Sequence, residues 1–121
     1  MNRKDYEIMA PVGSYESLMA AINAGADSIY FGIEGLNMRS KSANNFTTED
    51  LYKIAAICRE HDVKSYLTVN TIIYDEDLEL MRKIIDSAKD ADVSAIIAAD
   101  VAPMLYARSI GVEVHLSTQL N

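Results

Sequence analysis

Short apolar runs alternate along the chain with longer stretches in which apolar residues recur every three or four positions. The short runs are rich in β-branched and aromatic residues, as buried strands are, and the longer stretches have the period of amphipathic helices. The expected strands are residues 7–10, 28–31, 64–69, 95–99 and 113–116. The pattern predicts a βαβαβαβαβ order in which most strands are buried on both faces.

The helical stretches have one apolar stripe each, and two of them have clear start signals. Ser14 is the expected N-cap of the first helix, and Thr47 with Asp50 three positions later has the spacing of a capping box for the second. Gly25 is the expected stop of the first helix. The predicted stripes are Leu18, Ala21, Ile22 and Gly25 in the first helix, Leu51, Ile54, Ala55 and Cys58 in the second, and Leu78, Met81, Ile85 and Ala88 in the third.

Parallel strands joined by helices allow two architectures, an open doubly wound sheet and a closed eight-stranded barrel. The length of 121 residues favours the open sheet, but such a sheet normally ends in a fifth helix, which does not follow the last expected strand here. A phosphate-accepting receiver would need a carboxylate after the third strand, where this sequence has Asn70. We therefore expect residues 1–121 to be the N-terminal part of a single α/β domain, a parallel (β/α) barrel of TIM type. They would supply about five strands and four helices of an eight-fold barrel of roughly 250 residues.

Composition narrows the classes of function. Half of the residues are hydrophobic, which is enough for a core, and the formal net charge of −7 argues against a broad phosphate-binding surface. The single cysteine, Cys58, cannot form an internal disulfide and lies on a helix stripe, so we interpret it as a packing residue. No Cys or His cluster has the spacing of a metal site. The polar N-terminus precedes an apolar run too short for a signal peptide or a membrane span, so we expect a soluble cytoplasmic protein.

Barrel enzymes place their chemistry in the loops that follow the C-terminal ends of the strands. Ser14 follows the first strand, where backbone N–H groups either hold an anion or are simply capped. The long second loop contains Arg39 and Asn45. Arg39 either binds a carboxylate or phosphate group or is a solvated cation, and Asn45 is expected to line the pocket. Asn70 and Asp100 follow the third and fourth strands and could orient a substrate and exchange a proton, although Asp100 could equally cap a helix.

The fifth strand leads into a run of hydrogen-bonding side chains that includes Ser117, Gln119 and Asn121. A nucleophilic Ser117 would need a base within hydrogen-bond reach. His115 would lie about 6–7 Å away along the strand, at a rise of ~3.3 Å per residue, and His61 is expected at the far end of the second helix. We therefore do not expect a catalytic triad from this chain, and we interpret His115 as a buried histidine of a barrel layer.

Four segments resemble, in the right order, the N-terminal region of the collagenase-like peptidase family U32. They are MAPVGS at 9–14, GADSIYFG at 25–32, YLTVNT at 66–71 and HLSTQLN at 115–121, to which Arg39 and residues 44–46 add. Each segment is a weak signal by itself, but together they span nearly the whole chain. The resemblance implies a barrel whose later strands lie beyond residue 121.

The resemblance implies two enzyme chemistries. The family is named for collagenase-like proteolysis, which makes a peptidase our first expectation. Other members are oxygen-independent hydroxylases of transfer RNA, ribosomal RNA or ubiquinone precursors, with prephenate implicated as oxygen donor and cysteine-bound iron–sulfur clusters. Some of them carry a cluster ligand in the second loop, where this sequence has no cysteine at 37–39, so an iron–sulfur cluster is expected only in the part after residue 121.

The prediction is therefore an enzyme of which residues 1–121 alone would be inactive, and its catalytic residues are Asn70, Asp100 and Ser117. The expected substrate-binding residues are Ser14, Arg39, Asn45, Gln119 and Asn121. The substrate would be a peptide, an RNA or a small molecule. A third alternative is an inactive binding or assembly module, because five barrel strands leave two unpaired edges and an exposed inner face that favour self-association.

Overall fold

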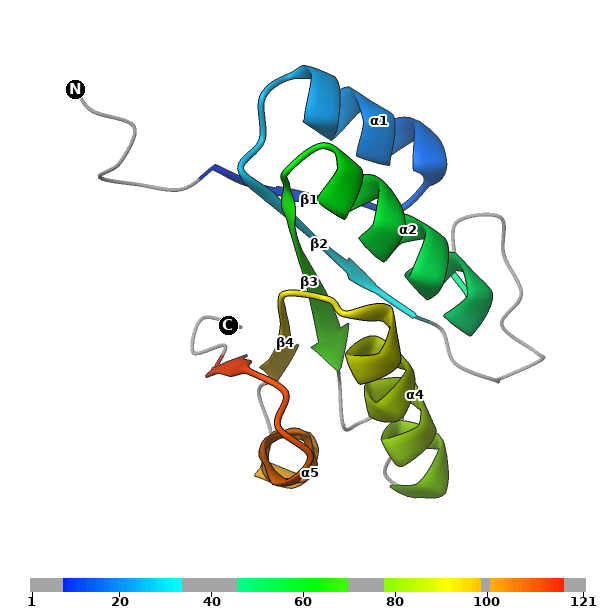
Figure 1. The fold of residues 1–121 in the computed structure, drawn as a ribbon, viewed down its shortest axis with the longest axis vertical. Helices are drawn as coiled ribbons and strands as arrows, with labels where there is room; N and C mark the ends of the chain where they lie inside the picture. The colour runs from blue at the N-terminus through cyan, green and yellow to red at the C-terminus, as the bar shows by residue number, and fades with distance from the viewer. Residues whose placement is uncertain (1–7, 34–45, 70–77, 99–100, 117–121) are drawn as a thin grey trace.

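The computed structural model describes residues 8–33, 46–69, 78–98 and 101–116. Its elements are β1 (Met9–Pro11), α1 (Tyr15–Asn23), β2 (Ser28–Gly32), α2 (Thr48–Glu60), β3 (Lys64–Val69), α4 (Leu78–Ala91), β4 (Ala95–Ala98), α5 (Val101–Ser109) and β5 (Val114–Leu116). All neighbouring strands are parallel, and their order across the sheet is β1-β2-β3-β4-β5, the order in the sequence (Figure 1).

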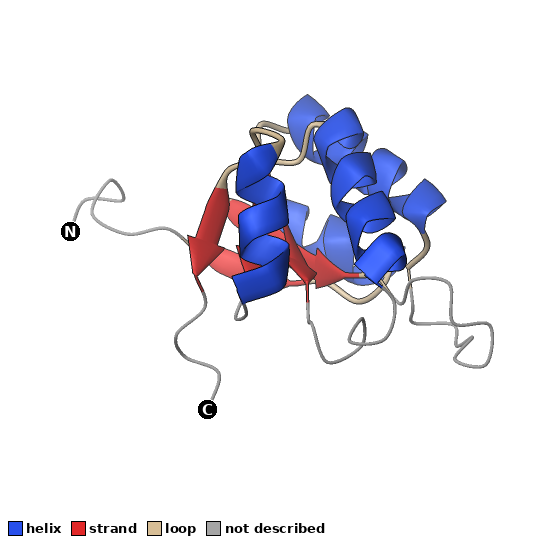
Figure 2. Ribbon diagram, turned by 90° about the horizontal axis from the view of Figure 1, so that it is seen from below, coloured by secondary structure: helices blue, strands red, loops and turns tan. Residues whose placement is uncertain are grey.

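The helices lie on one side of the sheet (Figure 2). A doubly wound sheet has helices on both faces and reverses its strand order at a switch point, whereas a barrel winds in one direction with its helices outside. The consecutive strand order and the one-sided helix layer are those of a barrel segment. They confirm the predicted fold class and exclude the open doubly wound sheet for the described residues.

Side chains along each strand alternate between the helix layer and the opposite side of the sheet, as the pleat requires. The helix-facing set includes Ile29, Phe31, Leu67, Val69, Ile96 and Ala98, all buried in the core. We call the opposite side the inner face. By alternation and register it carries Met9, Pro11, Ser28, Tyr30, Gly32, Lys64, Tyr66, Thr68, Ala95, Ile97 and His115.

The core lies between the sheet and the helices. The predicted stripe of α2 is confirmed, since Leu51, Ile54, Ala55 and Cys58 are all fully buried. Each fully buried Leu or Ile contributes about 1.5–3 kcal/mol relative to an exposed one. In α4 the prediction was wrong for Leu78, which is 47% exposed. Leu78 is the first residue of the helix, and periodicity gives the direction of a side chain but not how far the neighbouring layer extends.

The expectation that most strands are buried on both faces holds only for the middle of the sheet. Tyr66 and Ala95 are buried on the inner face, in β3 and β4. The expectation is wrong for β1, where Met9 and Pro11 are exposed. The strand β1 pairs with one neighbour only among the described residues, so one of its flanks lacks a covering strand.

Candidate functional site

Polar and aromatic side chains cross the inner face in rows set by the strand register. Tyr30 of β2 is the register partner of Tyr66 in β3. Closer to the C-terminal ends of the strands, one row runs from Gly32 through Thr68 and Ile97 to His115. In a parallel barrel the functional end is the one at which the strands terminate. This row is therefore the part of the described inner face nearest to the expected mouth.

Thr68 and Gly32 fit together at the centre of this row. The Thr68 Oγ1 donates a hydrogen bond to the carbonyl oxygen of Phe31 at 3.2 Å. A Cβ atom at Gly32 would lie 3.1 Å from the same Oγ1, which is tighter than an ordinary contact. Glycine at this position thus leaves room for the hydroxyl group of the neighbouring strand.

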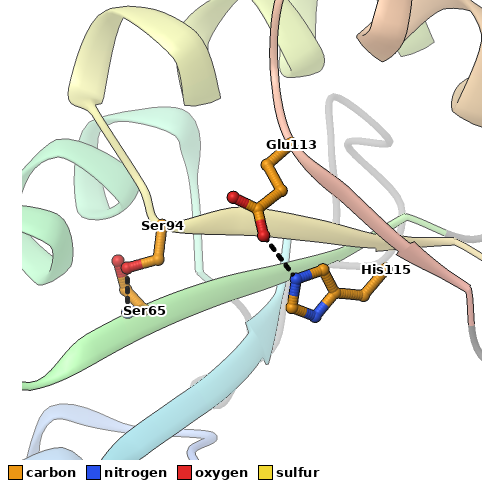
Figure 3. A network of polar contacts seen from close by, with 4 residues as sticks. All are labelled: Ser65, Ser94, Glu113 and His115. Carbon is orange, nitrogen blue, oxygen red and sulfur yellow. Dashed lines mark hydrogen bonds and ion pairs between the residues drawn. The ribbon is translucent and has the colours of Figure 1, made fainter.

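His115 has two well-defined contacts at the edge of the same row. Its Nε2 lies 2.8 Å from Oε2 of Glu113, and the two side chains point toward each other (Figure 3). Its ring lies 5.3 Å from the ring of Tyr66, centroid to centroid, at an interplanar angle of 42°. The prediction of a buried histidine is wrong, because 44% of the His115 side chain is exposed. Burial presupposes strands on both sides, whereas β5 pairs only with β4 among the described residues.

Ser14 is the predicted site residue that the structure describes. It is the N-cap of α1, and its Oγ accepts a hydrogen bond from the Ser17 N–H at 3.1 Å. The backbone N–H groups of Gly13 and Ser14 both donate to Ser17 Oγ, at 3.1 and 3.0 Å. The capping role is therefore confirmed, and an anion would have to displace Ser17 from these donors. A substrate-binding role for Ser14 stays a prediction.

The other predicted site residues lie outside the described residues. They are the catalytic candidates Asn70, Asp100 and Ser117 and the binding candidates Arg39, Asn45, Gln119 and Asn121. The structure does show that β1 to β5 are parallel, so their C-terminal ends share one edge of the sheet. The roles given to these seven residues stay predictions.

Cys58 is confirmed as a packing residue. Its side chain is fully buried on α2, and this burial raises the pKa of its thiol to about 11. A buried, protonated thiol is neither a ready nucleophile nor a ready metal ligand.

Within the described ranges, no three His, Cys, Asp or Glu side chains lie close enough together to hold a metal ion. The described helices also include none that is both long and apolar enough to cross a membrane.

Sequence reasoning missed Glu113 and Tyr66 as members of the site. The sequence did contain a signal for Glu113, because a side chain two positions before His115 along a strand points to the same face of the sheet. The contact between Tyr66 and His115 had no such local signal. It crosses from β3 over β4 to β5 and depends on the register of both strand pairs.

The one-sided helix layer and the consecutive parallel strands define a segment of a (β/α) barrel whose inner face carries polar, aromatic and apolar side chains. The chain belongs to peptidase family U32, whose family model matches residues 13–121. It is 78% identical over all 121 residues to a Porphyromonas gingivalis protein named "Collagenase" and covers 29% of that protein. It is 34% identical to a Bacillus subtilis tRNA hydroxylation protein, covering 96% of this chain and 28% of the relative. The chain thus spans less than a third of the length of these relatives.

Solved structures support the barrel architecture independently. The tryptophan synthase alpha subunit from Pyrococcus furiosus superposes with a TM-score of 0.60 at 18% identity, covering 91% of this chain and 54% of that one. The subunit from Legionella pneumophila gives a TM-score of 0.59 at 13% identity, covering 92% and 52%. At these identities the similarity concerns the fold alone.

Proposed function

We propose that this chain forms the first part of the barrel of a peptidase, and that the peptide binds where the strands end. The observation that carries the proposal is the 78% identity, over every residue of the chain, to a protein named "Collagenase". The match runs along the whole chain, so it includes the strands of the inner face and the segments that follow them. The 38% identity to a Methanocaldococcus jannaschii protein named as an uncharacterized protease supports the same reading.

The proposed roles follow the chemistry of the rim residues. Arg39 would bind a carboxylate of the peptide through its guanidinium group. Asn70 and Asp100 would orient the amide that is cleaved, and Ser117 would lie beside it. Ser14, Asn45, Gln119 and Asn121 would complete the binding surface. The common edge formed by the C-terminal ends of five parallel strands supports this grouping.

Cleavage of a fluorogenic collagen-like peptide by the full-length protein tests this proposal. We expect hydrolysis by the wild type, a KM roughly tenfold higher for Arg39→Ala, and a lower kcat for Asp100→Asn. The matched control is Arg108→Ala, which removes an exposed arginine from the last turn of α5 in the helix layer. A pure wild-type protein that cleaves no peptide would overturn the proposed activity.

A second candidate function is hydroxylation of RNA or of a ubiquinone precursor. The RNA reading is favoured by the relatives named as tRNA hydroxylation proteins and by an Escherichia coli relative named 23S rRNA 5-hydroxycytidine C2501 synthase, 28% identical over 113 residues. Iron–sulfur clusters are held by sets of cysteine thiolates. The residues of this chain do not fit such a cluster, because its one cysteine, Cys58, is buried in the core. Cluster ligands would have to come from another part of the longer protein.

Iron and acid-labile sulfide in the full-length protein, purified without oxygen, separate the two candidates. Stoichiometric iron and sulfide, together with a hydroxylated nucleoside in RNA treated with the protein, would favour the hydroxylase. Peptide cleavage by an iron-free protein would favour the peptidase. If neither activity is found, the remaining alternative is a binding or assembly module.

A further inference from the structure

We propose that Glu113 and His115 form a carboxylate–imidazole pair that transfers a proton on the inner face, with Nδ1 of His115 as the proton acceptor. The proposal deepens the peptidase function and rests on it for the identity of the bond that is cleaved. The pair itself is defined by geometry in the described part of the chain.

The first support is the geometry of the strand. Residues two positions apart on a strand point to the same face, and Glu113 directly precedes β5, which contains His115. The separation of 2.8 Å between Nε2 and Oε2 is that of a charge-assisted hydrogen bond. Figure 3 shows the carboxylate directed at the ring nitrogen. The shared strand face and this contact together place the carboxylate against the ring nitrogen.

The second support is the contact that holds the ring from another strand. The ring of Tyr66, only 4% exposed, lies against that of His115. One contact fixes the direction of the Nε2–H bond, and the other limits rotation of the ring. Two contacts therefore orient the imidazole, and neither of them uses Nδ1 as a hydrogen-bonding atom.

These contacts assign the two ring nitrogens different roles. An ionised carboxylate only accepts hydrogen bonds, so the neutral imidazole donates from Nε2 and carries its lone pair on Nδ1. No hydrogen bond to Nδ1 from another described residue accompanies the Glu113 contact. A carboxylate that orients a histidine in this way leaves the opposite nitrogen as a general base.

The proton transfer balances for hydrolysis of a peptide bond. Nδ1 takes a proton from a water molecule as the water oxygen forms a bond to the carbonyl carbon. The bond from carbon to the amide nitrogen then breaks, and the proton passes from His115 to the departing amine. Water and an amide give an acid and an amine, and no oxidant or reductant is needed. Glu113 remains ionised throughout and acts as a positioning residue.

Kinetics of variants in the full-length protein test the role of the pair. We expect His115→Gln to lower kcat for peptide cleavage roughly 100-fold, with little change in KM. Glu113→Gln should lower kcat by a smaller factor, because the base remains but is less well oriented. The control is His61→Gln, at an exposed histidine that caps the C-terminal end of α2. Imidazole added to His115→Gly should restore part of the activity, which a purely structural role would not allow. An unchanged kcat in His115→Gln would overturn the proposal.

A chemical measurement separates failure of the pair from failure of the peptidase assignment. Diethyl pyrocarbonate acylates unprotonated imidazole nitrogens, and peptide mass spectrometry follows each histidine in the same molecule. At alkaline pH we expect His115 to react several-fold faster in the wild type than in Glu113→Gln, with His61 reacting equally in both. Equal rates at His115 would overturn the pair. A Glu113-dependent rate in a protein that cleaves no peptide would support the pair and overturn the peptidase assignment.

Discussion

At the scale of single residues, Asp50 combines a helix cap with a contact between helices. Its Oδ2 accepts hydrogen bonds from Thr47 N at 2.9 Å and Thr47 Oγ1 at 3.1 Å, and its Oδ1 accepts one from the Tyr15 hydroxyl at 2.6 Å. Partial burial acts to raise the pKa of Asp50, but the bonds from Tyr15 and Thr47 outweigh it and hold the pKa below its ordinary value. Burial, followed by the bond to Asp50, raises the pKa of Tyr15.

The depressed pKa of Asp50 makes stability depend on pH in one direction. A carboxyl group whose pKa is lower in the folded state stabilises the fold above its unfolded pKa, and this contribution is lost as pH falls through the folded pKa. We expect Asp50→Asn to lower the free energy of unfolding by about 1 kcal/mol at neutral pH. The difference between wild type and variant should shrink as pH falls below the ordinary value of 3.8.

Urea denaturation at a series of pH values measures this effect. The control is Asp62→Asn, which removes an exposed carboxylate at a left-handed position, with φ 61°, that asparagine also tolerates. A constant difference between wild type and Asp50→Asn from neutral to acid pH would contradict the role assigned to the carboxylate.

The residues that the sequence predicted well are those with local partners. Ser14 and the Thr47–Asp50 capping box depend on spacings of three residues, and the structure confirms both. The burial of His115 was wrong because burial depends on which strands flank a position, which no local spacing encodes. The same limit explains Leu78. The helical period predicted the direction in which its side chain points, but not whether a neighbouring element buries it.

At the scale of elements, the four turns from helix to strand repeat one geometry. Each turn has one residue with positive φ, namely Gly25, Asp62, Asp92 and Gly111. The next residue donates its N–H to a carbonyl five positions back, as Ala26 does to Ala21 and Val63 does to Cys58. This is the Schellman arrangement, which satisfies the last carbonyl groups of a helix. One turn type therefore returns each helix to the sheet in the same sense.

The conformation of Gly25 predicts a cost for a single methyl group. Gly25 has φ +91°, and a Cβ atom built there meets no atom within 4 Å. The expected effect of Gly25→Ala is therefore conformational, a loss of about 1 kcal/mol in the free energy of unfolding. Gly13→Ala is the matched control, since its Cβ also meets nothing and its φ is not positive. Equal stability of the two variants in urea titrations would contradict the account.

Successive helices are also linked by tyrosine–aspartate hydrogen bonds. Beside the Tyr15–Asp50 bond between α1 and α2, Tyr52 donates to Asp90 of α4 at 3.0 Å. Tyr106 of α5 donates to Asp86 of α4 at 2.6 Å. Each neighbouring pair of described helices thus has one such bond across its outer surface. The bonds add specific contacts to a layer that is otherwise held by apolar packing.

The Tyr106–Asp86 bond gives the clearest test, because it is short and joins α4 to α5. We expect Tyr106→Phe to lower the free energy of unfolding by about 0.5–1.5 kcal/mol. A double-mutant cycle with Asp86→Ala, which removes the acceptor, should show that the two effects are not additive. Tyr30→Phe is the control, at a half-buried inner-face tyrosine outside the helix layer. Additive effects of the two changes would show that the bond contributes little in solution.

Element boundaries were predicted better for a long strand than for a short one. The strand expected at residues 64–69 is β3 to the residue, whereas β1 reaches Pro11, one position beyond its expected end. The six residues of β3 include the aromatic Tyr66 and the β-branched Thr68 and Val69, and they give a stronger signal than the three residues of β1. The candidate site is harder to predict, because it combines side chains from several strands.

At the scale of the whole molecule, the decisive feature is the order of the strands. The sequence predicts alternating strands and helices, but this alternation fits both an open sheet and a barrel. Pairing of each strand with the next one along the chain selects the barrel and places residues from β2, β3 and β5 on one inner face. The Tyr66–His115 contact exists only because of this order, which explains why sequence reasoning alone did not find it.

The same architecture predicts that the 121-residue chain associates with itself in solution. Among the described residues β1 and β5 each pair on one side only, and the inner face has no helix layer. Exposed or half-exposed apolar side chains there, such as Met9 and Ile97, favour burial against a second copy. Unpaired strand edges favour the same outcome.

Sedimentation equilibrium at micromolar concentration measures this association, and two charge insertions locate it. Ile97→Lys places a charge on the inner face and should shift the chain toward monomer. Leu105→Lys places the same charge at a position that is 59% exposed on α5 and should leave association unchanged. If Leu105→Lys dissociates the chain and Ile97→Lys does not, the helix layer rather than the inner face mediates contact between copies. A wild-type chain that is monomeric throughout would show that half of a barrel can leave its inner face uncovered, and a substrate would then reach His115 without displacing a partner.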